Sequence, residues 1–312
     1  MRAATCCAWA ADTGCNTAEY GPVRITPLTA HIGAAVEDVD ITAPLDETTR
    51  TSLRAALCRR AVLVFRNQAL TDAQQVTFTK ALGPLEPTIP SDPIGDGGPI
   101  GVLTNIDAEG HIIPPDDKRV LYAVANTLWH SDGAFRRVPL RGSVLAAKVI
   151  PPTGGDTEFA SLTAPYALLP AARKTEIADL AVEHSMAHSR AQIAPDLMSE
   201  EFLNATPPVV HPLVRTVAET GERALLVGSY AGKIIGWPSE KGAELLRELL
   251  EWCTQPQFVY CHRWRTDDLL VYDNRCCLHR GRAWDRAAHA RVLHRTTLAG
   301  DDSLKAQCPS SP

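Results

Sequence analysis

The sequence predicts a mainly β domain of the sandwich or jelly-roll type, with helices packed outside the sheets. Three observations support this fold class. Short apolar runs of strand length recur along the 312 residues, few segments show helical periodicity, and the two kinds do not alternate regularly. Regular alternation would instead predict a parallel sheet with helices on both faces. The chain contains no internal repeat and no low-complexity block.

The N-terminal half contains segments of both kinds. Alternating apolar runs within residues 23–41 are typical of strands. Asp46 and Thr71 each precede a helical pattern and are suitable N-caps, so we expect a helix after each of them. The continuous apolar run at 61–65 lies between these helices and predicts a buried central strand.

The C-terminal half continues the pattern of short strands with interspersed helices. In chain order we expect a strand at 143–150, a strand resuming at 157, a helical segment at 164–180 interrupted at Pro170, a hairpin at 212–228, an amphipathic helix at 239–252, and strands at 258–260, 269–272 and 291–298.

Composition and charge exclude several classes of protein. A hydrophobic content of 45% is enough for the core of one large domain, or of a domain with insertions. The net charge of −5, without a basic stripe, argues against a nucleic-acid partner. No apolar run reaches the roughly 18 residues that a membrane span needs. Nine cysteines without a Cys-x-x-Cys pair favour a reducing cytoplasm over a disulfide framework.

We expect a single domain over residues 21–302 with short additions at both ends. Residues 1–20 are interpreted as a poorly ordered extension, although a misassigned start would give the same pattern, and 303–312 as a tail. Residues 84–119 are rich in Pro, Gly and Asp, which is typical of a functional loop or a disordered one. An active-site lid is the preferred interpretation, with a surface insertion as the alternative.

The stretch Leu128–Asp132 carries the first candidate metal ligands. In extended backbone, residues i and i+2 point to the same face, so His130 and Asp132 would converge on one point. One imidazole and one carboxylate suit one side of a two-His-one-carboxylate Fe(II) site. Because 10 histidines make a chance His-x-Asp pair common, a histidine in a polar turn is the simpler alternative. A metal site would need a second histidine.

Two stretches near the C-terminus could complete such a site. His279 follows a predicted strand and turn, where a ligand could face a barrel interior. Arg291 and Arg295 share one face of the last strand, about 13 Å apart at roughly 3.3 Å per residue, while His294 faces away. If that face is interior, burying two guanidinium groups is costly unless each meets an anion such as a carboxylate. If it faces solvent, the arginines are ordinary surface charge.

Together and in this order, the motifs resemble those of the Fe(II)/2-oxoglutarate-dependent dioxygenases of the taurine dioxygenase family. The similarity runs from about Val23 to Asp301. Within the family, the chain looks most like the 2,4-dichlorophenoxyacetate (aryloxyalkanoate) dioxygenases. The matching motifs are Trp129–Asp132, Gly154–Thr157, Asp273–Arg275 with His279, and Arg291 with Arg295.

The resemblance implies a double-stranded β-helix core of the cupin-like jelly-roll type. It implies an oxidoreductase that uses Fe(II), 2-oxoglutarate as cosubstrate, and O2. The metal ligands and catalytic residues would be His130, Asp132 and His279, the residues binding the far carboxylate of 2-oxoglutarate Thr157 and Arg291, and the substrate-binding residues Arg295 and Asn126.

The resemblance also implies hydroxylation of a small anionic substrate, with release of succinate and CO2. An aryloxyalkanoate such as 2,4-dichlorophenoxyacetate would be cleaved to a phenol and glyoxylate. The alternative substrate is an alkyl sulfate or a sulfonate such as taurine, but the segment Gly83–Thr88 lacks the sulfonate-binding histidine of taurine dioxygenase. The gap from His279 to Arg291 is one residue longer than in taurine dioxygenase.

Two alternatives from other classes stay open at this point. A zinc hydrolase could use the same three side chains with a bound water, but it would not explain the paired arginines. A jelly-roll protein could bind a metal without oxygenase activity. We further expect a small anionic organic partner, no nucleic-acid or membrane partner, a cytoplasmic location and a homo-oligomer.

Overall fold

The computed structural model describes residues 23–89, 95–114, 117–194 and 197–301. The predicted extension at 1–20 and the predicted tail at 303–312 lie outside the described residues. Among the residues described, no helix combines the length and the apolar character needed to cross a bilayer.

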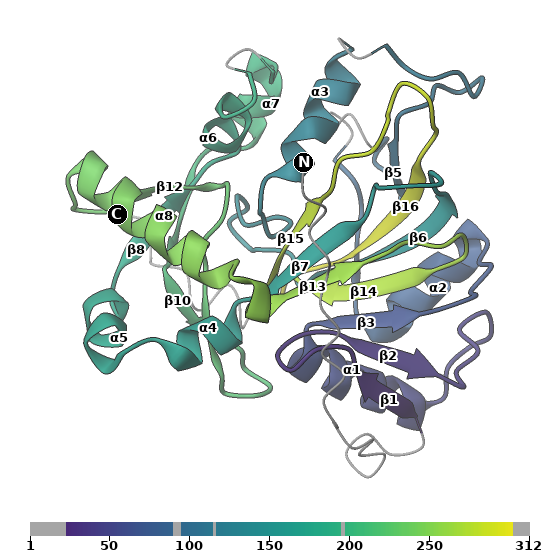
Figure 1. Ribbon diagram of the computed structural model, residues 1–312, viewed down its shortest axis with the longest axis horizontal. Helices are drawn as coiled ribbons and strands as arrows, with labels where there is room; N and C mark the ends of the chain where they lie inside the picture. The colour runs from purple at the N-terminus through teal and green to yellow at the C-terminus, as the bar shows by residue number, and fades with distance from the viewer. Residues whose placement is uncertain (1–22, 90–94, 115–116, 195–196, 302–312) are drawn as a thin grey trace, which may run out of the picture.

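The largest element is an eight-stranded sheet that runs through the right-hand part of the molecule in Figure 1. Its path is β1-β2-β3-β14-β6-β16-β4, and β5 also pairs with β16. All these pairs are antiparallel except β2 with β3. The strands are β1 (Arg24–Pro27), β2 (Ala34–Glu37), β3 (Val62–Phe65), β4 (Leu85–Glu86), β5 (Gly101–Thr104), β6 (Gly142–Val149), β14 (Leu269–Asp273) and β16 (Val292–Leu298).

Three smaller sheets complete the β structure of the described residues. The sheet β13-β7-β15 contains the candidate ligand His279 in the middle of β15, and all its pairs are antiparallel. The members of the three sheets are β13 (Val259–His262), β7 (Thr157–Ser161) and β15 (Cys277–Gly281); β12 (Ala231–Ile234), β8 (Ala181–His184) and β9 (Val209–Pro212); and β10 (Val214–Thr216) with β11 (Arg223–Leu225).

The two central strands β6 and β14 bury both of their faces, which explains their continuous apolar sequences. Val144 and Val271 pack in the core cluster that includes residues of α1 and α2. Their neighbours Leu145 and Leu270 belong to the other large cluster, which contains Phe159 of β7. Because successive side chains of a strand point to opposite faces, one strand contributes to both clusters. The predicted jelly-roll class with external helices is confirmed.

Helices lie outside the sheets, and most of those from the middle of the chain gather on the left in Figure 1. The predicted N-caps are present, since Asp46 accepts a hydrogen bond from the backbone of Thr49 and Thr71 from that of Gln74. The helical segments are α1 (Glu47–Arg60), α2 (Asp72–Leu82), α3 (Lys118–Val124), α4 (Thr163–Leu168), α5 (Ala171–Ile177), α6 (Met186–Ala191), α7 (Glu200–Ala205), α8 (Ser239–Cys253), and the 3-10 helices η2 (Ala125–Thr127) and η3 (Pro256–Phe258).

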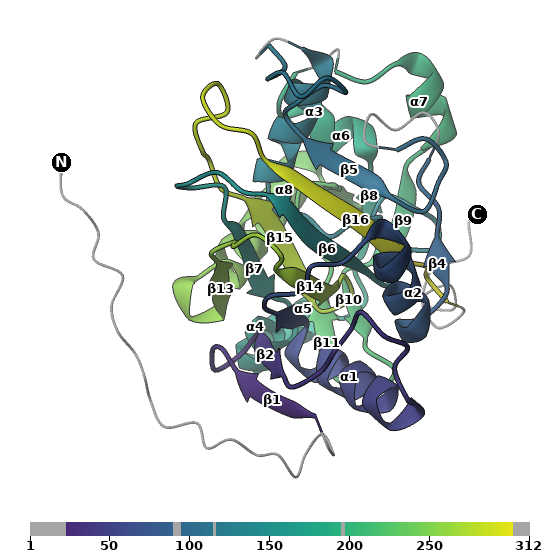
Figure 2. The same cartoon turned by 90° about the vertical axis from the view of Figure 1, so that its right-hand side faces the viewer.

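Two local predictions differ from the structure. The described residues of the segment 84–119 are less irregular than expected, because β4 and β5 both pair with β16 (Figure 2). The stretch at 128–132 is not a regular strand: only His130 forms an isolated bridge, and Asp132 lies in a turn. This stretch has no regular strand ladder, and hydrogen bonds from the backbone of His279 hold it instead, as described below.

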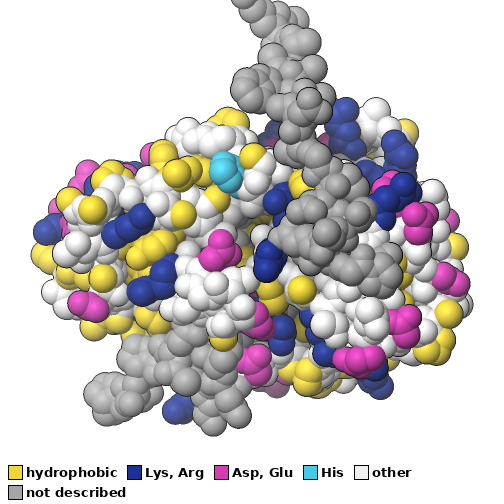
Figure 3. Space-filling view, turned by 90° about the horizontal axis from the view of Figure 1, so that it is seen from below, with side chains coloured by type: hydrophobic (Ala, Val, Ile, Leu, Met, Phe, Trp, Pro, Cys, Tyr) yellow, Lys and Arg dark blue, Asp and Glu magenta, His cyan; other side chains and the backbone are white. Residues whose placement is uncertain are grey.

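On the face seen in Figure 3, acidic and basic side chains are interspersed and hydrophobic side chains are scattered between them. Charges of both signs lie close together on the visible part of that face. Interspersed charges of this kind produce no extended single-sign field.

A buried ion-pair network follows β14. Arg275, 1% exposed, donates to both carboxylate oxygens of Asp273 and to Glu219. The Asp273 carboxylate therefore forms an ion pair with Arg275, at 2.7 Å. Asp273 is 0% exposed and depends on this cation for compensation.

We therefore expect Arg275→Met to lower the free energy of unfolding by about 3–5 kcal/mol, because it leaves the Asp273 carboxylate buried without its cation. Urea unfolding followed by circular dichroism measures the change. The double variant with Asp273→Asn should recover part of the loss, since the uncompensated charge is gone. A loss below about 1 kcal/mol in the single variant would contradict the assignment of a buried ion pair.

Candidate metal centre and pocket

Three side chains from distant parts of the chain converge on one point. The candidate ligand atoms of His130, Asp132 and His279 all lie within 4.8 Å of one another, and all three residues are buried. The Nε2 atoms of the histidines lie 3.8 Å and 3.7 Å from Oδ1 of Asp132. Two ligands that each lie about 2.1 Å from one ion are at most about 4.2 Å apart, so these separations fit a single metal ion.

The backbone brings the two histidines together. His130 and His279 form an isolated antiparallel bridge, in which each backbone N–H donates to the other carbonyl, at 3.0 Å and 2.8 Å. Their imidazole ring centroids are 4.1 Å apart. His279 follows the strand β14 and a turn, as the sequence predicted, and it lies within β15, whose pairing with β7 fixes its orientation.

Asp132 is oriented by two hydroxyl groups. Ser143 and Tyr272 donate to its Oδ2 at 2.8 Å and 2.7 Å, which leaves Oδ1 facing the imidazoles. Its backbone N–H donates to the side chain of Asn274 at 3.0 Å. The sequence did not predict the roles of Ser143 and Tyr272, which pair with each other across β6 and β14. The sequence signal that could have revealed them was a hydroxyl-bearing residue within each apolar strand. Such partners orient ligands and tune their basicity.

Electrostatics favour neutral imidazoles beside an ionised carboxylate. Burial lowers the pKa of His130 and lowers that of His279 to about 3. Burial alone would raise the pKa of Asp132, but Arg295 and the two histidines hold it below its ordinary value. His130 Nδ1 lies 2.8 Å from the carbonyl of Leu128. A proton on that nitrogen leaves the Nε2 lone pair directed at the shared point.

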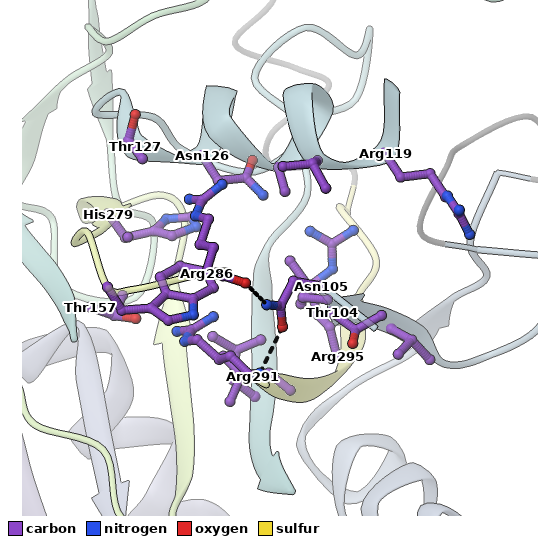
Figure 4. Close-up of a pocket in the computed structure, with 18 of the residues that line it drawn as sticks. Thr104, Asn105, Arg119, Asn126, Thr127, Thr157, His279, Arg286, Arg291 and Arg295 are labelled. Carbon is purple, nitrogen blue, oxygen red and sulfur yellow. Dashed lines mark hydrogen bonds between the residues drawn. The ribbon is translucent and has the colours of Figure 1, made fainter. Parts of the chain in front are cut away.

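The three side chains open onto a pocket of about 240 Å³. Figure 4 shows side chains from η2, β7, β16 and the preceding loop reaching into it. The structure thus brings all of the sequence-predicted site residues to the wall of one cavity. They are His130, Asp132, His279, Thr157, Arg291, Arg295 and Asn126.

At one end of the pocket, Arg291 is buried beside Thr157. Arg291 Nε donates to the carbonyl of Gly155 at 3.1 Å. Burial and then the charge of Arg286 lower its pKa to about 10, so it stays charged at neutral pH. Among the described residues, no carboxylate lies within 4.0 Å of its guanidinium group. A buried cation without a carboxylate predicts an anionic ligand.

Two further residues, both missed by sequence analysis, hold this end of the pocket. Trp264 Nε1 donates to Thr157 Oγ1 at 2.9 Å. Asn105 accepts from the backbone N–H of Arg291 at 2.8 Å (Figure 4). Both contacts join residues far apart in the sequence, so no local motif marks them.

The Gly154-Gly155 pair has a geometric reason here. Both residues have positive φ angles, of 73° and 71°. A Cβ atom at Gly154 would lie 2.6 Å from the carbonyl oxygen of Ala283, and one at Gly155 would lie 3.2 Å from the Arg291 side chain. The pair therefore lets the turn before β7 approach both the loop after β15 and the buried arginine.

Arg295 lies at the other end, beside the metal-binding residues. Its Nη1 is 3.4 Å from Asp132 Oδ1. It lines both the main pocket and an adjoining one of about 50 Å³, as does Asn126 of η2. His294 points to the other face of β16, as predicted, where its Nδ1 lies 2.7 Å from an Asp72 carboxylate oxygen on α2.

Comparisons with known proteins agree with this geometry. Residues 24–297 match the family described as taurine catabolism dioxygenase TauD, TfdA family. An alpha-ketoglutarate-dependent 2,4-dichlorophenoxyacetate dioxygenase of Cupriavidus pinatubonensis is 39% identical, over 90% of this chain and 99% of that protein. A (S)-phenoxypropionate/alpha-ketoglutarate-dioxygenase of Delftia acidovorans is 33% identical, over 89% and 95%.

A solved structure gives the same answer. The crystal structure of AAD-2 in complex with Mn(II) and N-oxalylglycine superposes with a TM-score of 0.82 at 37% identity, covering 89% of this chain and 97% of that one. Neither the hydrolase nor the binding-protein alternative accounts for these matches. The chain belongs to the taurine catabolism dioxygenase TauD, TfdA family and is an Fe(II)- and 2-oxoglutarate-dependent dioxygenase.

Proposed function

We propose that this enzyme hydroxylates a small aryloxyalkanoate, such as 2,4-dichlorophenoxyacetate, and so cleaves its ether bond. The observation that carries this proposal is the composition of the pocket wall beside the candidate metal ligands. A cation, Arg295, lies next to Asp132, and apolar side chains line the same cavity. An aryl ring suits the apolar wall and a carboxylate suits the guanidinium. The printed activities of the relatives support the same substrate class.

His130, Asp132 and His279 would hold Fe(II), which together with 2-oxoglutarate and O2 supplies the oxidation of a C–H bond with release of succinate and CO2. The protein's part is to bind and orient. Arg295 would hold the substrate carboxylate, which fixes the carbon beside the ether oxygen as the one facing the centre. The hydroxylated carbon is a hemiacetal and collapses to a phenol and glyoxylate.

The described residues of the segment 84–119 would act as the lid that the sequence suggested, placed over the aryl ring. The segment contributes apolar residues to the pocket, among them Leu103, Ile106 and Ile113. Side chains from β5 and the following loop thus form an apolar part of the pocket wall. Because this wall excludes water, it favours the binding of an apolar aryl ring over that of a polar group that keeps its hydration.

A substrate panel tests the proposal. Protein loaded with Fe(II) and 2-oxoglutarate is given 2,4-dichlorophenoxyacetate, both enantiomers of a phenoxypropionate, an alkyl sulfate and taurine, and succinate and product are measured together. We expect coupled release of succinate and a phenol with an aryloxyalkanoate. Coupled turnover with the sulfate or taurine alone would overturn the substrate assignment and favour the alternative chemistry.

We also propose that Thr157 donates its hydroxyl proton to the far carboxylate of 2-oxoglutarate. Because Trp264 Nε1 already donates to Oγ1, the hydroxyl's own proton is available to a ligand in the pocket. Thr157→Val should weaken 2-oxoglutarate binding about tenfold, as expected for a hydrogen bond to a charged group. Titration of the metal-loaded protein with 2-oxoglutarate measures this. Thr157→Ser should bind normally; equal losses in both variants would contradict a role for the hydroxyl.

A cytoplasmic location is supported by the cysteines, since those described are free thiols: Cys58, Cys253, Cys261, Cys276 and Cys277. The homo-oligomer stays a prediction. The mass of the protein in solution, measured by light scattering, would show whether it contains one chain or several.

A further inference from the structure

Outside the pocket, one arginine joins three backbone segments that carry residues of the candidate site. The guanidinium carbon of Arg280 lies 4.5 Å from the ring centroid of Trp129, and Arg280 Nε donates to a carboxylate oxygen of Glu158 at 2.8 Å. Arg280 belongs to β15, Glu158 to β7, and Trp129 to the stretch between η2 and β6. Because one side chain contacts the other two segments, we call these three residues the arginine clamp.

The strand register explains why these residues are neighbours. His130 and His279 face each other in the isolated antiparallel bridge. The residues next to them, Trp129 and Arg280, therefore lie opposite each other across the same bridge. Arg280 is also the register partner of Glu158 in the pairing of β15 with β7 (Figure 1). Since successive side chains of extended backbone point to opposite faces, the arginine clamp stands back to back with the two imidazoles.

Each member of the arginine clamp has a neighbour in the chain that reaches the pocket. The pocket wall includes His130, His279 and Thr157, whereas no clamp residue is among the described residues that line it. The adjacent pairs are Trp129 with His130, Arg280 with His279, and Glu158 with Thr157. A displacement of the clamp would therefore move the backbone of the metal-binding residues, although the clamp itself lies outside the pocket.

The stretch that carries His130 is held to β15 by a short backbone contact. His130 and His279 exchange two hydrogen bonds, at 3.0 Å and 2.8 Å, and the bridge does not continue into a ladder. On the other side of the stretch, the Trp129 carbonyl accepts the backbone N–H of Ser229 at 2.8 Å. The indole of the buried Trp129 against Arg280 adds a side-chain constraint at the point where a ladder would otherwise continue.

We propose that Arg280 is a positioning residue for the metal centre, because its contacts with Trp129 and Glu158 fix the stretch carrying His130 against the strand carrying His279. The inference rests on the proposed assignment of the two histidines as metal ligands. A metal site needs its ligands within about 0.5 Å of their productive positions. A looser bridge would therefore lower the affinity for the ion without removing any ligand.

Mn(II) binding to the purified protein, measured by titration calorimetry well below the unfolding temperature, tests this role. Arg280→Met keeps an unbranched side chain but loses the charge, and it should weaken Mn(II) binding about tenfold, the lower end for residues that orient metal ligands. Arg280→Lys keeps a cation for the indole and for Glu158, so its affinity should stay within about threefold of that of the unaltered protein. Circular dichroism checks that both variants fold.

The sign of the effect separates positioning from simple electrostatics. Removing a positive charge near a cation site favours binding of the cation, so a purely electrostatic role of Arg280 predicts tighter Mn(II) binding in Arg280→Met. Tighter or unchanged binding in that variant would overturn the inference. Equal losses in Arg280→Met and Arg280→Lys would overturn it as well, because the lysine keeps the charge that the clamp requires.

Trp129 gives an independent arm of the test. Trp129→Leu removes the aromatic face and should weaken Mn(II) binding about tenfold, whereas Trp129→Phe keeps a ring for Arg280 and should lose less. If both residues act through one contact, the double variant Trp129→Leu with Arg280→Met should lose about tenfold rather than about 100-fold. Losses that multiply would show that the two side chains act separately and would contradict the clamp.

The matched control is Arg282→Gln. Arg282 is more exposed than Arg280 and lies 3.5 Å from the same Glu158 carboxylate, but it is not part of the arginine clamp, so this variant should bind Mn(II) normally. His279→Ala separates failure of the inference from failure of the ligand assignment. If His279→Ala loses Mn(II) while Arg280→Met does not, only the role of Arg280 is wrong. If neither variant loses it, the ligand assignment itself is wrong.

Discussion

His279→Ala should lose stoichiometric Fe(II) binding and reduce succinate formation by more than about 100-fold, since losing even a residue that only orients a ligand costs about 10–100-fold. The physical reason is the geometry of the centre. His279 Nε2 lies 3.7 Å from Asp132 Oδ1, and its ring stands against that of His130. Without His279, one imidazole and one carboxylate remain, and these two ligands are too few to hold the ion tightly. Metal analysis after gel filtration and a succinate assay measure the two effects.

The matched control is His294→Ala. His294 is also a histidine near the C-terminus, but it points away from the pocket to Asp72 on α2. We expect this variant to bind one Fe(II) per chain and to form succinate at a rate near that of the unaltered enzyme. Retained Fe(II) binding and turnover in His279→Ala would contradict the ligand assignment.

The second large effect is expected at Arg295. Arg295→Gln should lower kcat/KM for the organic substrate about 100-fold, while the affinity for 2-oxoglutarate changes less than about threefold. A guanidinium group can bind a carboxylate through two parallel hydrogen bonds, which the neutral amide of glutamine cannot replace. Steady-state kinetics with each substrate varied in turn measures the two parameters separately.

Arg295 also lies 3.4 Å from Asp132, so its loss could disturb the metal centre. Arg295→Lys controls for this, because it keeps a positive charge beside the carboxylate but not the two-point geometry. We expect the lysine variant to bind Fe(II) normally and still to lose most of kcat/KM. Parallel losses for both substrates in either variant would argue against separate roles for Arg295 and Arg291.

Much of the site could be predicted from the sequence because its ligands lie in short, recognisable motifs. His130 and Asp132 are two residues apart, and Arg291 and Arg295 are four apart, so each pair can be recognised locally. The order of the motifs then suggested the family, and the family suggested the fold. The faces of β16 followed from strand periodicity alone, since His294 and Arg295 point to opposite sides.

What the sequence did not predict depends on contacts between distant segments. Ser143 and Tyr272 reach Asp132 because β6 and β14 pair in one register, which neither strand specifies by itself. Asn105 and Trp264 each join segments far apart in the chain. The backbone of His130 is held by an isolated bridge to that of His279, a residue far away in the sequence that no local pattern marks as its partner.

We expect one ferrous centre and one 2-oxo acid to share the pocket between His279 and Arg291. The most direct test is to add one equivalent of Fe(II) and then 2-oxoglutarate to the purified protein in the absence of O2. O2 is then admitted, and succinate is measured by chromatography. We expect a visible absorption band when 2-oxoglutarate is added, and succinate after O2 is admitted, with both absent in His279→Ala. Tight Fe(II) binding with neither a band nor succinate in the unaltered protein would contradict this expectation.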